Sequence, residues 1–345
     1  MITQLLSACA ETYDLAAEIL ENGGLVAFPT ETVYGLGANA LDADAVLSIF
    51  AAKGRPADNP LIVHIHDRAQ LEPLCTVPEK ALPLMDAFWP GPLTLLCERK
   101  PLIPSEVTAG LPTVAVRMPS HPVARAMLQA CNLPIAAPSA NSSGRPSPTT
   151  AAHVLEDMDG KIPLIIDGGM CDVGLESTVL DLCHGDPVIL RPGGITKEMI
   201  EQVLGCEVQV AGSVLRPLRK DEKALSPGMR YKHYSPEASV TLVDGPEERV
   251  VPLLEKLYRE QTGLGRKCCV LCFSEHLDRL SGCNPHDIGS ASSPSETAHR
   301  LFDILRRLDE EHMEVVFSEV LPPEGVGLAV MNRLGRAAAF HTIHA

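Results

Sequence analysis

Short apolar runs, most of them closed by proline or glycine, recur along this chain and alternate with stretches of helical spacing. LVAFP (25–29), PLIVHIH (60–66) and PLTLLCE (92–98) are too short for typical helices and predict buried strands. Residues 42–54 begin with acidic side chains and carry apolar residues at helical spacing, which predicts a helix. Strands interleaved with helices in this way indicate an α/β fold built on a large, mixed and twisted sheet.

Further elements follow from the same patterns. A helix is predicted at 12–22, ended by Gly23 and Gly24, and the glycine-containing stretch TETVYGLGANA (30–40) is predicted to be a loop. The other strands of this part are predicted at 113–119, 133–139, 162–168, 177–182 and 187–193, and the other helices at 67–74, 78–88, 121–131, 149–157 and 196–204.

The chain is predicted to contain two domains joined by a linker. The first domain takes in residues 1–210, and the basic stretch 211–237, punctuated by proline and glycine, is interpreted as an interdomain linker. Residues 238–345 are predicted to form a smaller, Rossmann-like α/β domain of about 100 residues. Its strands are predicted at 240–245, 268–273, 286–290 and 314–320, and its helices at 246–260 and 294–310.

The charge is strongly negative and unevenly distributed. The 345 residues carry a net charge of −15. Residues 1–210 contain 12 basic and 25 acidic side chains, whereas the remainder contains 17 and 19. Proteins that bind nucleic acid tightly usually have the opposite sign, so the balance argues against a surface that grips RNA as a whole.

The cysteines and the start of the chain indicate the compartment. The 11 cysteines have no repeated spacing, and the opening residues lack a basic segment followed by an apolar one. No apolar run approaches the roughly 20 residues that span a bilayer. We therefore expect reduced thiols, a cytoplasmic location and no membrane partner. Cys268, Cys269 and Cys272 lie in a predicted buried strand, so core packing is favoured over a metal site, which would need a fourth ligand.

Three loops carry side chains suited to ligand binding, and each has a simpler interpretation. PTETVYGLG (29–37) follows a strand, where α/β sheets bind ligands; an ordinary turn is the alternative. Lys53 and Arg55 suit a polyphosphate, or are cations at a helix end. The serine-rich loop 137–147 precedes a predicted helix and suits a phosphate or nucleotide, or is a solvated loop.

Two further features lie at strand ends. Thr113 and Arg117 are four residues apart on one predicted strand and therefore share a face. The segment Glu176-Ser177-Thr178 lies at the start of the strand predicted at 177–182, and Arg191 lies in the RPGG turn that closes the strand after it. The sequence has no P-loop and no GxGxxG motif, so a nucleotide would be held by other means.

Together these segments resemble the YrdC-type threonylcarbamoyl-AMP synthase family. Its KxR…SxN signature corresponds to Lys53-x-Arg55 and Ser139-x-Asn141. The PTETVYGLG loop, the NPLIVHI strand, the WPGPLT turn, the VAVRMP strand and the RPG turn also match its pattern. The resemblance covers roughly the first 210 residues, and the remainder is similar to the long form of the family, which has a linker and a C-terminal domain.

The resemblance implies a nucleotidyl transfer that uses ATP and Mg²⁺. L-threonine and bicarbonate would form a carbamate, which attacks the α-phosphate of ATP and releases pyrophosphate. The product, threonylcarbamoyl-AMP, would serve to modify an adenosine next to the anticodon of tRNA. Because the sequence suggests no carboxylate cage, Mg²⁺ is expected on the ATP phosphates. A tRNA-modifying transferase is implied as a partner, with weak or no direct binding of tRNA.

The resemblance also assigns residues to the substrates. The catalytic signature would be Lys53, Arg55, Ser139 and Asn141. ATP would contact Arg55, Asn59, Thr113, Ser139, Ser147 and Arg191, and, from the linker, Tyr231, His233 and Tyr234. Threonine would contact Thr32, His64, Arg117, Ala137 and Ser177. Without the resemblance, His64 would be read as a core histidine, since it lies in an apolar strand.

Three alternatives remain open at this point. The same fold occurs in carbamoyltransferases that mature hydrogenase metal centres, but their upstream zinc-finger cysteine pairs are missing from this sequence. A double-stranded-RNA-binding module without catalysis is the second alternative. The third concerns the linker: SPGMRYKHYSP (226–236) is interpreted as a lid over the ATP site, with a solvated hinge as its alternative.

Overall fold

The computed structural model of the protein describes residues 1–214, 216 and 235–345. These residues form two compact units: residues 1–143 and 147–214 make up the first, and residues 235–345 make up most of the second. The linker predicted at 211–237 lies largely outside the described residues, so its limits stay predictions.

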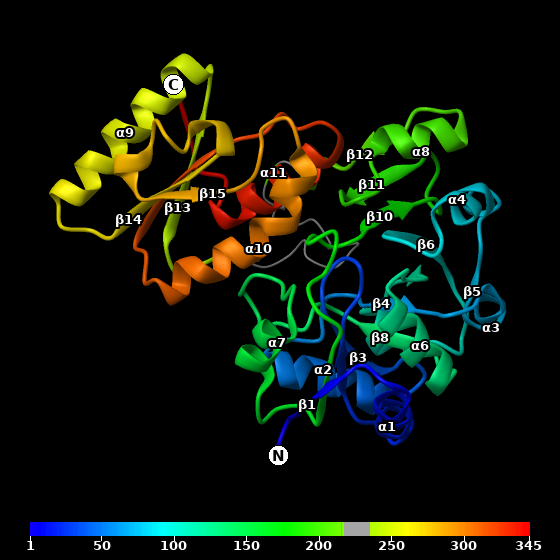
Figure 1. Cartoon of the computed structure of the whole chain (residues 1–345). Coiled ribbons are helices and arrows are strands. Elements are labelled where there is room, and N and C mark those ends of the chain that lie inside the picture. Colours follow the sequence, from blue (N-terminus) through cyan, green and yellow to red (C-terminus); the bar gives the residue numbers. More distant parts are fainter. Residues whose placement is uncertain (215, 217–234) are drawn as a thin grey trace. The chain divides into compact units, whose positions relative to one another are not determined.

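A mixed sheet is the frame of the first unit (Figure 1). The strands described in it are β1 (Gln4–Ser7), β2 (Val26–Phe28), β3 (Gly35–Asn39), β4 (Ile62–His64), β5 (Cys75–Thr76), β6 (Leu93–Arg99), β7 (Thr113–Arg117), β8 (Ile135–Ala137), β9 (Leu164–Asp167), β10 (Thr178–Asp181), β11 (Val188–Arg191) and β12 (Gln209–Val210). Their order is β1-β9-β2-β3-β8-β4-β7-β6-β10-β11-β12, and β5 pairs with β6. Parallel pairs such as β4 with β7 and antiparallel pairs such as β4 with β8 confirm the predicted mixed sheet.

Helices cover both faces of this sheet. They are α1 (Ala10–Glu21), α2 (Ala43–Lys53), α3 (Leu71–Leu74), α4 (Ala81–Phe88), α5 (Ser105–Thr108), α6 (Pro122–Cys131), α7 (Ala151–Met158) and α8 (Lys197–Leu204). Successive side chains of β2 pack into two different cores. Val26 and Phe28 pack with α1 and α6, whereas Ala27 packs in the core that contains α2. Apolar residues on both faces explain why these strands read as continuous apolar runs.

The prediction of a loop at residues 30–40 is wrong in part, because Gly35–Asn39 forms strand β3, which pairs antiparallel with β2. Glycine is depleted in strands, so the sequence favoured a loop. The strand needs glycine here because neighbouring side chains occupy its faces. A Cβ on Gly37 would lie 2.8 Å from Ile135 Cγ2 and 2.9 Å from Phe28 Cε1.

The second unit is a smaller α/β domain with a parallel sheet. Its elements are β13 (Ser239–Asp244), α9 (Glu247–Gly263), β14 (Cys268–Cys272), β15 (Pro285–Asp287), α10 (Pro294–Glu310), β16 (Val315–Glu319), α11 (Gly325–Ala337) and β17 (Thr342–His344). The strand order is β15-β14-β16-β13-β17, and the described pairs are all parallel. Figure 1 shows α9 on one side of this sheet and α10 and α11 on the other, which confirms the predicted Rossmann-like architecture.

Two elements of the second unit were not predicted. Helix α11 contains Gly325, Gly327 and Gly335, which lower helix propensity, and β17 has only three residues. The strand that contains Cys268, Cys269 and Cys272 is confirmed as β14, and all three thiols are buried. Burial raises the pKa of Cys268 to about 11 and that of Cys272 to about 12, so both thiols are protonated at neutral pH.

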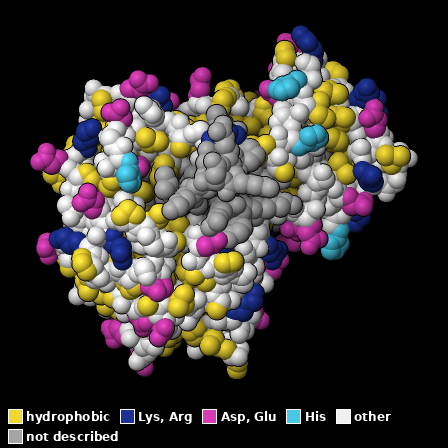
Figure 2. Space-filling view, turned by 180° about the vertical axis from the view of Figure 1, so that it is seen from behind, with side chains coloured by type: hydrophobic (Ala, Val, Ile, Leu, Met, Phe, Trp, Pro, Cys, Tyr) yellow, Lys and Arg dark blue, Asp and Glu magenta, His cyan; other side chains and the backbone are white. Residues whose placement is uncertain are grey.

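No helix among the described residues is long and apolar enough to cross a membrane. On the face that Figure 2 presents, acidic and basic side chains are interspersed over the described surface.

Candidate functional site

The two halves of the KxR…SxN signature are in direct contact. Lys53 is the last residue of α2, and its Nζ donates to the backbone carbonyls of Ser139, at 2.5 Å, and Asn141, at 2.6 Å. A third bond reaches Asn141 Oδ1 at 3.3 Å. Only 3% of Lys53 is exposed. The predicted turn after the helix is confirmed, since Gly54 has φ of 67° and closes α2 in the left-handed conformation.

The loop that contains Ser139 and Asn141 is bonded internally and to the loop after β2. Ser139 Oγ donates to Asn141 Oδ1 at 2.5 Å, and Asn141 Nδ2 donates to the Ser142 carbonyl. The backbone N–H of Ala140 donates to the carbonyl of Tyr34. Hydrogen bonds therefore connect the α2 terminus, the serine-rich loop and the PTETVYGLG segment into one region.

Arg55 and Asn59 follow this helix end. The Arg55 guanidinium carbon lies 5.2 Å from the centroid of the Phe50 ring, a cation–π contact that holds the side chain near the helix. Asn59 is fully buried, and neither its Nδ2 nor its Oδ1 has a hydrogen-bond partner among the described residues. A buried amide without partners is unusual, and here it offers a ligand one donor group and one acceptor.

A buried ion pair lies at the end of β7. Arg117 Nη2 is 2.7 Å from Glu31 Oε1, Arg117 Nη1 donates to Thr32 Oγ1 at 2.9 Å, and Arg117 Nε donates to the Gly91 carbonyl. Glu31 Oε2 also accepts the backbone N–H of Ser120. Burial alone would raise the pKa of the Glu31 carboxyl, but the charge and hydrogen bond of Arg117 outweigh it and hold that pKa below its ordinary value.

The hydroxyl of Thr32 has a defined direction. Thr30 Oγ1 donates its proton to the Val33 carbonyl at 2.6 Å, so across the 2.8 Å contact between the two threonines it must accept the proton of Thr32. Thr32 Oγ1 already accepts from Arg117. One lone pair of Thr32 Oγ1 therefore remains to accept a further hydrogen bond.

His64 is buried and neutral. Its ring packs edge-on against Phe28, with centroids 6.0 Å apart, and Nδ1 donates to the Ile62 carbonyl. Burial, assisted by the charge of Arg117, lowers the pKa of His64 to about 3. Ala137 is on the neighbouring strand β8, in register with Ile62.

Ser177 and Arg191 are in contact. Arg191 donates from Nε to the Ser177 carbonyl at 3.0 Å and from Nη2 to Ser177 Oγ at 3.1 Å. Ser177 Oγ also lies 2.7 Å from Thr94 Oγ1. The RPGG turn approaches closely, since a Cβ on Gly193 would lie 2.3 Å from the Thr178 nitrogen. Residues that the resemblance assigned to ATP and to threonine thus share a boundary.

The remaining predicted residues are placed as follows. Ser147 is fully buried, and its Oγ donates to Glu176 Oε1 at 2.5 Å. Thr113 is buried at the start of β7, the strand that ends with Arg117, so the predicted strand is confirmed. Tyr231, His233 and Tyr234 lie outside the described residues. The described residues contain no group of three or more His, Cys, Asp or Glu side chains that could hold a metal ion.

Sequence reasoning missed three partners of the predicted residues: Glu31, Glu176 and Thr94. Each contacts a residue that is distant in sequence, respectively Arg117, Ser147 and Ser177. The sequence could have indicated a partner for Glu31. A carboxylate between two threonines in an otherwise apolar stretch needs a cation when it is buried.

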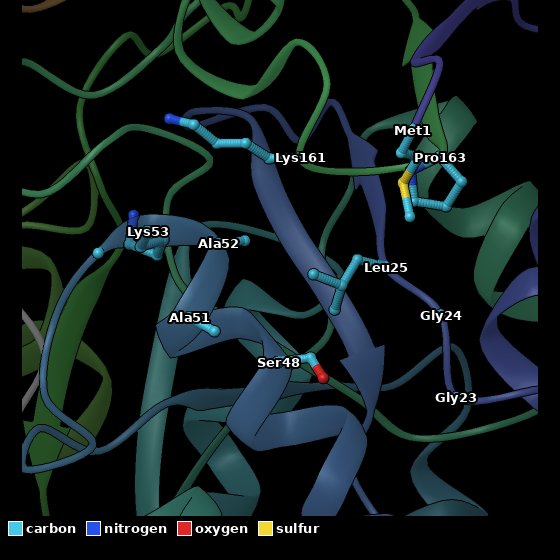
Figure 3. Close-up of a pocket in the computed structure, with 11 residues that line it drawn as sticks. Met1, Gly23, Gly24, Leu25, Ser48, Ala51, Ala52, Lys53, Lys161 and Pro163 are labelled. Atoms are coloured by element: carbon cyan, nitrogen blue, oxygen red, sulfur yellow. The ribbon is translucent and has the colours of Figure 1, made fainter.

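A cavity of about 660 Å³ adjoins α2 away from most of these residues. Figure 3 shows Ser48, Ala51 and Ala52 of α2 along it, facing the Gly23–Leu25 segment. Of the predicted site residues only Lys53 lines it, and the Nζ of Lys53 is bonded to the serine-rich loop. The cavity therefore lies outside the constellation described above.

Comparison with known proteins identifies relatives over both units of the chain. The family model described as telomere recombination matches residues 18–193, and the model described as threonylcarbamoyl-AMP synthase, C-terminal domain, matches residues 195–339. The threonylcarbamoyl-AMP synthase of Bacillus subtilis is 48% identical over 99% of this chain and 97% of its own length. The protein of the same name from Pyrococcus abyssi is 47% identical over 95% of this chain and 94% of its own.

A solved structure extends the match to the whole fold. The crystal structure of P. abyssi Sua5 complexed with L-threonine has a TM-score of 0.94 and 45% identity, and the match covers 99% of this chain and 100% of that one. Both family models match in order, and full-length relatives are nearly half identical. This chain belongs to the threonylcarbamoyl-AMP synthase family.

Proposed function

We propose that this protein joins L-threonine, bicarbonate and ATP into threonylcarbamoyl-AMP and pyrophosphate. The observation that carries the proposal is the bonding of Lys53 to the loop of Ser139 and Asn141, which unites the two halves of the signature. The name of the full-length relatives and the L-threonine in the P. abyssi Sua5 crystal support the same reaction.

The reaction has two bond-forming steps. The neutral threonine nitrogen attacks CO₂, which forms from bicarbonate with loss of hydroxide, and the nitrogen gives up one proton as the carbamate forms. Direct attack on bicarbonate gives the same carbamate and releases one water in total. A carbamate oxygen then attacks the α-phosphorus of ATP, the bond to the β-phosphate oxygen breaks, and pyrophosphate leaves with the electron pair. Such transfer depends on positioning and charge neutralisation more than on covalent help from the protein.

The ATP side of the site is assigned to the cations and hydroxyls around the signature. Arg55 and Arg191 neutralise phosphate charge, and Asn59 supplies hydrogen bonds from an amide that has no partner among the described residues. The remaining assigned contacts are Thr113, Ser139 and Ser147. Lys53 and Asn141 support these groups by holding the serine-rich loop against α2.

The threonine side is assigned to the loop after β2 and the end of β7. Arg117 binds the threonine carboxylate, and Glu31 keeps the guanidinium in place. Thr32 offers an acceptor, which suits the substrate amine or hydroxyl. The remaining assigned contacts are His64, Ala137 and Ser177. Because Arg117 and Glu31 form a neutral pair, zwitterionic threonine enters without a net change of charge at this subsite.

The wider setting of the reaction is also part of the proposal. Mg²⁺ enters on the phosphates of ATP, where it neutralises their charge. The product serves the modification of an adenosine next to the anticodon of tRNA in the cytoplasm, through a transferase partner. The net charge of −15 and the interspersed charges seen in Figure 2 support weak or no direct binding of tRNA.

The linker is proposed as a lid over the ATP site, with Tyr231, His233 and Tyr234 as its contacts. A lid would keep water away from a carbamate and an adenylate that both hydrolyse readily. The Tyr234→Ala change should weaken ATP binding, and proteolytic cleavage at Arg230 or Lys232 should slow when ATP and threonine are present. Unchanged cleavage together with unchanged ATP affinity would exclude the lid.

One assay tests the central proposal. The protein is incubated with ATP, labelled threonine and bicarbonate, and the products are analysed for an acid-labile adenylate and for pyrophosphate. Pyrophosphate release should require both threonine and bicarbonate. Rapid ATP hydrolysis without either co-substrate would contradict the proposal, and salt-sensitive tRNA binding without turnover would favour the RNA-binding alternative.

A further inference from the structure

The sheet of the second unit reverses its winding between β13 and β16. From β13 the chain passes through α9 to β14, which lies beyond β16 in the sheet order. From β16 it passes through α11 to β17, which lies beyond β13. Adjacent parallel strands whose connections leave in opposite directions open a crevice at their carboxyl ends, and α/β domains bind ligands in such crevices.

A cavity of about 330 Å³ lies at this crevice. Leu242 and Asp244 line it from the carboxyl end of β13, and Val320 and Leu321 line it from the segment after β16. Met331 of α11 adds a further apolar wall. This volume is at the lower end of the range for small-molecule sites, so it suits a ligand with a single ring system.

One aromatic wall of the cavity is held in a strained conformation. Phe340 has φ of 62°, a left-handed value that bulky residues rarely adopt, and its backbone N–H donates to the Gly335 carbonyl. A Cβ on Gly335 would lie 3.4 Å from the Phe340 ring, so the ring packs directly on the α11 backbone. The ring is therefore fixed at the cavity, where it offers a planar stacking surface.

The charges close to the cavity disfavour an anionic ligand. Asp244 is half exposed there and lies 3.3 Å from His344 Nδ1. The first turn of α9, which follows directly, carries Glu247 and Glu248. The start of a helix can bind a phosphate through its free N–H groups and its dipole, but these carboxylates add negative charge there and repel a phosphate. A nucleotide phosphate is thus disfavoured, and a cationic or neutral donor group is favoured.

We propose that the second unit binds a compact molecule at this switch-point cavity, one with a planar apolar body and a cationic or neutral donor head. The body stacks against Phe340 and Met331, and the head pairs with Asp244. The inference does not depend on the reaction proposed for the first unit.

Benzamidine is a suitable probe, because it combines one aromatic ring with an amidinium that pairs with a carboxylate. Benzoate is the matched control, with the same ring and the opposite charge. The full-length protein is labelled with ¹³C in its ten methionine methyl groups, and Met331→Leu identifies the Met331 signal. We expect benzamidine to shift that signal and to saturate it at concentrations of about 1–10 mM, while benzoate leaves it in place.

Two variants separate the head from the body of the site. Asp244→Asn should weaken benzamidine about tenfold, because the charge-assisted pair is lost. Val320→Trp fills the cavity from a partly exposed position and should abolish the shift. Asp244→Asn should retain threonine-dependent pyrophosphate release at the normal rate. The proposal is overturned if benzamidine shifts no cavity signal, if benzoate shifts it equally, or if Asp244→Asn binds benzamidine as tightly as the parent does.

Discussion

Replacement of Lys53 by methionine should destabilise the first unit as well as slow the reaction. Methionine keeps most of the apolar stem but removes the ammonium, which serves the carbonyls of Ser139 and Asn141 and the Asn141 side chain. Asn141 Oδ1 keeps the bond from Ser139 Oγ, but loss of the charged donor from each of the two buried carbonyls costs about 1–3 kcal/mol. The ammonium no longer has to be buried, which offsets part of this loss. We expect a net loss of about 2–4 kcal/mol in the free energy of unfolding.

Trp89 makes this loss measurable in the intact protein. It is the only tryptophan of the chain, it is buried in the first unit, and its Nε1 donates to the Leu93 carbonyl. Its fluorescence therefore follows unfolding of this unit. At roughly 2–4 °C per kcal/mol for a unit of this size, Lys53→Met should lower the midpoint by about 5–15 °C.

Asn59→Ala is the matched control. The Asn59 amide has no hydrogen-bond partner among the described residues, so its loss should cost less than about 1 kcal/mol while ATP affinity falls. The sequence alone predicts that Lys53 and Arg55 both affect turnover far more than stability. The bonds of Lys53 lead us to keep that expectation for Arg55 alone. There, loss of one guanidinium donor to the phosphates can lower the rate roughly 10²–10³-fold. An unchanged midpoint for Lys53→Met would refute the structural role of the ammonium.

Three further outcomes are expected. Arg117→Ala should raise the KM for threonine, with little change in ATP affinity by calorimetry. It should also destabilise the protein by about 3–5 kcal/mol, because the Glu31 carboxylate stays buried without its cation. Adding Glu31→Gln to this variant should therefore restore part of the unfolding midpoint. His64 should stay neutral in NMR titrations down to pH 4, because its pKa in the folded protein is about 3. In the unfolded chain its pKa is about 6.5, so between these two pH values only the unfolded chain binds the proton. The free energy of unfolding should therefore fall as the pH drops from 6.5 towards 3. Gly193→Ala should lower the stability by about 1–3 kcal/mol and also lower nucleotide affinity, because the added Cβ would lie 2.3 Å from the backbone. Gly194→Ala is the control, because its Cβ would meet only side chains, at 3.3 Å and beyond, and it should be tolerated better in the same assays.

Local pattern was enough for most of the fold, because buried strands and amphipathic helices carry their signals within a few residues. The run LVAFP became β2, and the acidic start at Asp42 became the N-cap that accepts from the N–H groups of Asp44 and Ala45. The KxR and SxN motifs, which the resemblance assigned to one catalytic signature, are in contact in the structure.

Elements and partners that depend on distant neighbours were not predictable. Strand β3 is glycine-rich because the side chains of Phe28 and Ile135 fill the space beside it, and Ile135 lies far from it in sequence. The same holds for Glu31, whose partner Arg117 lies in another strand. A pattern can show that a carboxylate needs a cation, but which cation it meets is decided by the sheet order.

The anchoring of the candidate site leads us to expect that substitutions there will change stability together with function. Arg117 is held by Gly91, Thr32 and Glu31, so its guanidinium fixes two loops against β7 before any ligand arrives. Lys53 holds a third loop in the same way. Such preorganisation lowers the reorganisation needed when charge develops in the reaction, but it makes each anchored residue part of the fold. Changes at the anchors will therefore report both effects, and only a residue such as Asn59, whose side-chain amide has no partner within the described chain, will report binding by itself.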